Sequence, residues 1–121
     1  MSSEPSRWDV TIVRHILKYC CEVEQAVACF GGGEAEFMAN AVYRNAVSMP
    51  VQQIGELSKR LSDAFVSEHP EIPWRQIKGM RDWFAHQYLE MDMGIMWAVA
   101  TEDLPPLRDF CEKFLARTGS T

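Results

Sequence analysis

The chain has 121 residues, of which 47% are hydrophobic, and its 12 basic and 17 acidic side chains leave a net charge of −5. This length suits one domain with a real core, so we expect a single domain over residues 1–121 with frayed ends at 1–6 and 118–121. The acidic balance excludes a broad basic face of the kind that gives nucleic-acid modules their affinity. If the chain binds a nucleic acid, its contacts must therefore be local, weak or supplied by a partner.

Membrane insertion and cysteine chemistry are also disfavoured. No apolar run is near the roughly 18 residues that a membrane helix needs, and the N-terminal MSSEPSRWD has no apolar stretch of the signal-peptide kind. We therefore expect a cytoplasmic chain. Cys20, Cys21, Cys29 and Cys111 include no C-x-x-C pair, which argues against a zinc site or a disulfide framework. Cys20 is expected to fill space in the core.

The first predicted helix covers residues 6–30, with Ser6 as its cap and Asp9 in the capping-box position. Its apolar residues recur at spacings of three and four, which predicts a core-facing stripe: Ile12, Val13, Ile16, Leu17, Cys20, Val23, Val27 and Phe30. A triple glycine, Gly31-Gly32-Gly33, follows. Because no strand precedes it and no lysine with serine or threonine comes after it, helix termination is favoured over a phosphate loop.

The middle of the chain predicts a short helical turn at residues 34–38 and a long helix at residues 40–66. Pro50 falls inside the long helix and either kinks it or splits it in two. Gly55, in the middle of the same helix, predicts close approach of another helix. Residues 67–71 are predicted to form a loop.

The most informative stretch is IPWRQIKGMRDWFAHQY at residues 72–88, which predicts one helix with Pro73 at its start. Its apolar stripe consists of Ile72, Ile77, Met80, Phe84 and, by position, Trp74. A polar cluster closes the helix. Asp82 and His86 are one turn apart on one face, and Arg81 and Tyr88 are two turns apart on one face.

Downstream, Asp92 is placed to cap a helix at residues 93–102, which we expect Pro105-Pro106 to interrupt. A last helix is predicted at residues 107–117. Its inward side chains are Leu107, Phe110, Cys111, Phe114 and Leu115. No segment alternates like a strand, so the sequence predicts an all-α antiparallel bundle of four to five helices.

The polar cluster suits one kind of chemistry. RNA cleavage without a metal ion uses the ribose 2′-hydroxyl as nucleophile, and it needs a base, an acid and a cation for the charge on phosphorus. His86 can serve as general base or acid, and Arg81 can hold two phosphate oxygens. Asp82 either orients His86 or holds Arg81, and Tyr88 is placed to touch RNA. Since each chain has one such histidine, a two-fold dimer would complete the site.

The same residues resemble a known family. Arg81, four residues, His86, one residue and Tyr88 are similar to the signature of HepT-like ribonuclease toxins of the HEPN superfamily. Asp82 fits the polar position after the arginine. Three flanking segments also agree, namely HPEIPWR before the motif, IGEL further upstream and DLP downstream. The resemblance as a whole covers roughly residues 8–115.

This resemblance implies a metal-independent endoribonuclease with no cofactor, acting as a homodimer whose interface forms the active site. It also implies a minimal nucleotidyltransferase as antitoxin, which uses ATP and can transfer AMP to the motif tyrosine, here Tyr88. Such a bulky anionic group would repel RNA. We further predict supporting roles for Asp82 and Glu56 and phosphate contacts from Arg75 and Lys78. Neither a membrane nor DNA is an expected partner.

Two other functions stay open on the sequence. The bundle could be a non-catalytic partner or substrate-binding subunit of a nucleotidyltransferase, with a nucleotide in its polar cleft. It could also be a structural dimer in which the side chains of the polar cluster only hydrogen-bond to one another, with His86 bonded to Asp82. His15 and His69 have no partner at metal-ligand spacing. The tryptophans are favoured as core or dimer-interface residues over base-stacking platforms: Trp74, Trp83 and Trp97.

Overall fold

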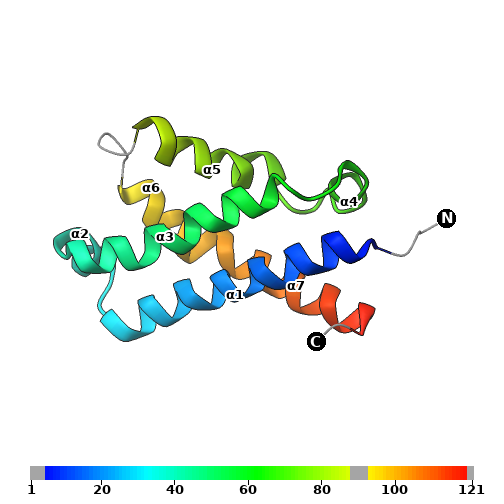
Figure 1. The fold of residues 1–121 in the computed structure, drawn as a ribbon. Coiled ribbons are helices and arrows are strands. Elements are labelled where there is room, and N and C mark those ends of the chain that lie inside the picture. Colours follow the sequence, from blue (N-terminus) through cyan, green and yellow to red (C-terminus); the bar gives the residue numbers. More distant parts are fainter. Residues whose placement is uncertain (1–4, 88–92, 120–121) are drawn as a thin grey trace.

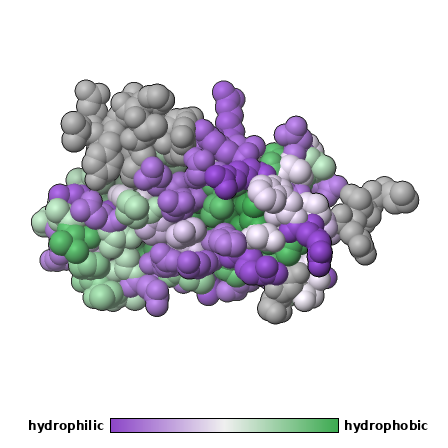
Figure 2. Space-filling model, in the orientation of Figure 1, coloured by the Kyte–Doolittle hydropathy of each residue, from purple (hydrophilic) through white to green (hydrophobic). Residues whose placement is uncertain are grey.

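The computed structural model describes residues 5–87 and 93–119, and for residues 81–87 it describes the backbone alone. Within these ranges the chain forms helices and no strand, so the predicted all-α fold is confirmed. No helix of the described part is long and apolar enough to cross a membrane, and Figure 2 shows hydrophilic residues over much of the face that it displays. The elements in chain order are α1 (Arg7–Phe30), α2 (Glu34–Ala39), α3 (Ala41–Ser58), α4 (Asp63–Glu68), α5 (Trp74–Gln87), α6 (Met93–Ala98), the π-helical η2 (Val99–Asp103) and α7 (Leu104–Thr118).

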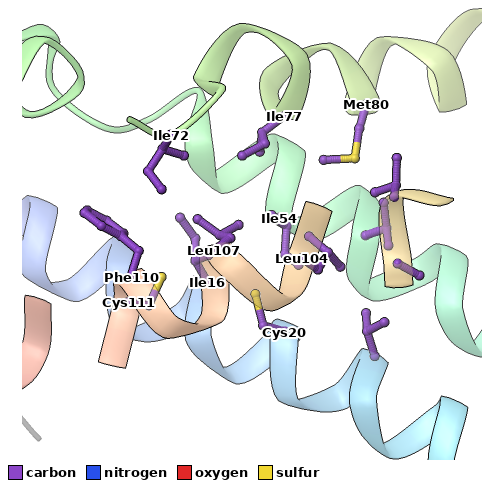
Figure 3. Packing of buried hydrophobic residues seen from close by; sticks show 14 of the residues in the cluster. Ile16, Cys20, Ile54, Ile72, Ile77, Met80, Leu104, Leu107, Phe110 and Cys111 are labelled. Atoms are coloured by element: carbon purple, nitrogen blue, oxygen red, sulfur yellow. The ribbon is translucent and has the colours of Figure 1, made fainter. Parts of the chain in front are cut away.

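The long helices form a bundle in which α3 lies between α1 and α5, while α7 packs along α1 (Figure 1). The core is built from the apolar stripes of these four helices. Figure 3 shows Ile72, Ile77 and Met80 pointing from one side toward Ile54 of α3 and Leu107 of α7. Every inward residue predicted for the last helix is buried.

The start and end of α1 follow the sequence pattern. The amide N–H of Asp9 donates to the Ser6 hydroxyl over 3.0 Å, so Ser6 caps the helix as predicted. Gly31 ends it with a φ of 66°, a left-handed conformation that glycine adopts without strain. The triple glycine therefore terminates a helix, as expected.

The buried carboxylate of Asp9 joins two helix starts that are far apart in the sequence. One of its oxygens accepts from the Ser62 amide over 2.8 Å. The other accepts from the Ser62 hydroxyl over 2.6 Å and from the Ser6 hydroxyl over 2.9 Å. Ser62 in turn caps α4, because its hydroxyl accepts from the Phe65 amide over 3.1 Å. Asp9 thus fixes the position of α4 against the first turn of α1.

This junction explains why the predicted helix at residues 40–66 is wrong at its C-terminal end. Helix α3 stops at Ser58 and α4 begins at Asp63, with a turn between them. In a continuous helix the Ser62 amide would donate to a carbonyl of the preceding turn, whereas here it donates to the Asp9 carboxylate. Splitting of α3 at Pro50, one of the two predicted outcomes, does not occur, since Pro50 lies inside a helix that continues to Ser58.

The predicted interruption at Pro105-Pro106 is also wrong. Both prolines lie in the first turn of α7, a position that tolerates a residue without an amide hydrogen. The preceding π turn, in which the Leu104 amide donates to the Val99 carbonyl, carries the chain into α7. The chain therefore stays helical from Met93 to Thr118.

Two thiols belong to the core, as predicted for Cys20. The side chains of Cys20 and Cys111 are buried, and Figure 3 shows both within the packed interior. Burial away from water raises the pKa of the Cys20 thiol to about 12. Among the tryptophans, Trp74 is buried and Trp97 packs against the core, as expected, whereas the side chain of Trp83 is outside the described part.

Candidate functional site

Helix α5 is held firmly at its N-terminal half. Pro73 precedes its first residue, and the Pro73 carbonyl accepts from the Ile77 amide over 3.1 Å. Trp74, Ile77 and Met80 are buried against the core. Because these residues lie one turn apart, a single face of α5 is fixed against α3 and α7.

The segment that enters α5 is anchored by His69. The indole nitrogen of Trp74 donates to the His69 carbonyl over 2.9 Å. The imidazole packs among aromatic rings, with its centroid 4.6 Å from Phe65 and 5.0 Å from Phe110, and its Nδ1 lies 3.8 Å from a Glu71 oxygen. His69 is therefore a structural residue that orients the start of α5.

A groove of about 720 Å³ lies between α5 and the α6–η2 segment. Its α5 wall includes Arg75 and Gly79, and its opposite wall includes Ile95 and Asp103. Arg75 is exposed, so its guanidinium can meet a ligand in the groove. Gly79 has open space where a Cβ would lie. The groove therefore has a largely apolar lining, with the Arg75 cation on one wall and the Asp103 carboxylate on the other.

The predicted catalytic residues lie on the C-terminal half of the same helix. Arg81, Asp82 and His86 are all within α5, which continues unbroken to Gln87. Their side chains are outside the part that the structure describes, as is Tyr88 altogether. The backbone at these three positions therefore continues the same helix whose earlier turns line the groove.

The predicted supporting residues occupy different surroundings. Arg75 lines the groove, whereas Lys78 is half-buried and is not among the described lining residues. Glu56 is half-buried on α3, the helix that packs against α5. The described residues contain no cluster of metal-ligating side chains. Of the two phosphate contacts predicted, Arg75 is thus the one that the groove exposes to a ligand.

Sequence reasoning missed Gly79, Ile95 and Asp103 as groove residues. Ile95 and Asp103 come from a segment that meets α5 only in the folded chain, so no local pattern marks them. Gly79 did carry a signal, because an isolated glycine inside a helical pattern often has a packing or functional reason.

Comparison with known proteins decides the family. The sequence model described as HepT-like ribonuclease matches residues 16–114, most of the chain. The chain belongs to the HepT-like ribonuclease family. The resemblance seen in the sequence is thereby confirmed, and with it the assignment to a ribonuclease family.

Individual relatives of this HepT-like chain agree. A protein of Thermococcus cleftensis named as a HepT ribonuclease is 37% identical over 78 residues, which cover 64% of this chain and 71% of the relative. A protein of Caldanaerobacter subterraneus named as an RNase is 29% identical over 105 residues, covering 87% and 92%. One of Methanocaldococcus jannaschii, also named as an RNase, is 32% identical over 73 residues, covering 60% and 67%. No solved structure matches the chain significantly.

Proposed function

We propose that this HepT-like chain is a metal-independent endoribonuclease, the toxin of a two-component module, with Arg81 and His86 in a composite site between two copies of the chain. The observation that supports it best is the single helix α5. Its N-terminal half is packed in the core and lines a groove, and the same helix continues through both motif residues. A rigid platform of this kind suits catalysis, because small displacements of catalytic groups are costly.

The register of α5 connects Asp82 and His86 to the groove. Positions 75, 79, 82 and 86 follow the i, i+4, i+7, i+11 spacing that defines one face of a helix. Arg75 and Gly79 are groove residues on that face, and Asp82 and His86 continue it toward the C-terminal end. An RNA strand whose phosphate contacts Arg75 would therefore run along the face that carries position 86.

The proposed roles follow from the chemistry. His86 moves the proton of the 2′-hydroxyl or of the leaving 5′-oxygen, and the second His86 of a dimer supplies the other transfer. Arg81 stabilises the charge that develops on the phosphoryl oxygens. Asp82 orients the imidazole or the guanidinium, with Glu56 as a further support from α3.

Regulation would follow from Tyr88, which is next to the end of α5 in the sequence. We propose a minimal nucleotidyltransferase as antitoxin that uses ATP to transfer AMP to Tyr88. The added phosphate carries negative charge into a site built for phosphate and so repels the substrate. This charge repulsion would switch the nuclease off without unfolding it.

The deciding experiment is RNA cleavage in EDTA by purified protein that mass spectrometry shows to be free of AMP. Wild type should cut RNA, whereas Arg81→Ala and His86→Ala should each lose about 10²-fold or more in rate. Matched controls are Arg60→Ala and His15→Ala, which remove an exposed arginine and an exposed histidine from α3–α4 and α1. These should cut RNA like wild type.

Two results would reject the proposal. Cleavage that persists in His86→Ala would place the chemistry elsewhere. If the unmodified dimer cuts neither structured nor single-stranded RNA, the chain acts instead as a non-catalytic partner of the nucleotidyltransferase.

A further inference from the structure

A second groove, of about 830 Å³, lies where the first turns of α1 meet the last turn of α7. The charged residues among its described lining are all arginines, namely Arg7, Arg14 and Arg117. All three are exposed. Thr11 and Thr118 add hydroxyl groups between them. Basic residues are outnumbered 12 to 17 in this chain, so the gathering of three arginines in one groove departs from its overall composition.

The position of Arg7 strengthens this observation. Arg7 is the first residue of α1, where the partial positive charge of the helix terminus disfavours a cation. Helix stability therefore does not explain the arginine at position 7. Arg14, two turns later, lines the same groove. An anionic ligand in the groove would compensate for the unfavourable position of Arg7.

We propose that this groove, defined by Arg7, Arg14 and Arg117, is a second RNA-binding site that holds backbone phosphates away from the point of cleavage. The proposal rests on the proposed ribonuclease function. Guanidinium groups can bind phosphate oxygens in pairs, and the Thr11 hydroxyl can add a donor that reads no base. The Thr118 hydroxyl already donates to the Leu115 carbonyl over 2.9 Å. The contacts would thus be independent of RNA sequence.

The groove is separate from the motif end of α5. Figure 1 shows the start of α1 and the end of α7 toward one end of the bundle, while the C-terminal end of α5 lies toward the other end. One RNA strand must therefore extend over the length of the bundle to reach both sites. The groove supplies the local positive charge that an acidic nuclease needs to hold a long substrate.

Binding is tested with a fluorescent single-stranded 2′-O-methyl RNA, which lacks the attacking hydroxyl and cannot be cut. Full-length wild type is compared with Arg7→Gln/Arg117→Gln. The matched control is Lys18→Gln/Lys113→Gln, which removes the same charge from exposed helix positions outside the groove. Circular dichroism melting checks that all variants are folded.

The expected loss follows from counterion release. Each single-strand phosphate contact contributes about 0.7 to the slope of log K against log salt, so losing two lowers the slope by about 1.4 and weakens binding roughly tenfold at about 0.15 M salt. Arg7→Lys/Arg117→Lys keeps the charge and should retain most of the slope. The control double variant should bind like wild type.

Two binding results would overturn the second site: an unchanged slope in the arginine double variant, or an equal loss in the control. Cleavage gives an independent readout. With long RNA the double variant should raise KM and keep kcat, and with very short RNA it should change neither. Since binding is measured on uncut RNA, absence of cleavage would refute the proposed nuclease and leave the groove test intact.

Discussion

Removing the Asp9 carboxylate should destabilise the whole domain, because this group holds α1 and α4 together. In Asp9→Ala three hydrogen bonds are lost, two from Ser62 and one from the Ser6 hydroxyl. Bonds to a charged acceptor are stronger than average, but both hydroxyls regain water. We therefore expect a loss of about 3 kcal/mol in the free energy of unfolding. For a chain of this size that lowers Tm by about 12 °C.

Urea unfolding followed by circular dichroism measures this loss directly. Asp63→Ala is the matched control, since Asp63 is an exposed carboxylate in the first turn of α4 and its removal should cost less than about 1 kcal/mol. Asp9→Asn keeps one acceptor for the Ser62 amide and should fall between the two. If Asp9→Ala proves as stable as Asp63→Ala, the junction is not what fixes α4.

Two further predictions concern α5 and the core. Gly79→Ala should stabilise the protein by about 1 kcal/mol, because the new Cβ meets nothing within 4 Å in the chain; a lower Tm in solution would instead mean that another copy covers this side of α5. Cys20 gives a pH dependence. Its thiol loses its proton near pH 9.0 when unfolded but only near 12 when folded, so raising the pH favours unfolding. Between about pH 8 and pH 10 wild type should lose about 1.4 kcal/mol more than Cys20→Ala in urea unfolding. Equal losses would show that Cys20 titrates in the folded protein.

Helices whose signals are local were predictable from the sequence. The apolar stripe from Ile12 to Val23 predicted α1, and Ser6 and Gly31 predicted its first and last turns. The break between α3 and α4 was not predictable, because the group that captures the Ser62 amide is Asp9, 53 positions away. A helix pattern that runs across residues 59–62 carries no sign of such a distant acceptor.

The candidate site was predictable only in part, for the same reason. The positions of Arg81, Asp82 and His86 within one helix, and of Arg75 on its surface, depend on local sequence, so they could be predicted. The groove beside them depends on Ile95 and Asp103, whose place against α5 is set by tertiary packing. The arginine groove has the same origin, since it joins Arg7 and Arg117 from opposite ends of the chain.

The π turn at Val99–Asp103 also sets the rotational phase between α6 and α7. A π turn is equivalent to an α-helix with one residue inserted, and each residue rotates the helix by about 100°. The wider turn absorbs that rotation, so Val99 and Leu104, five positions apart, both face the core. Deleting one residue within the turn should therefore restore regular α geometry and leave Met96 in the core. Deleting one residue elsewhere between Met93 and Thr118 would instead rotate one part of this helical stretch against the other by about 100°, so we expect the π turn to tolerate the loss of one residue best.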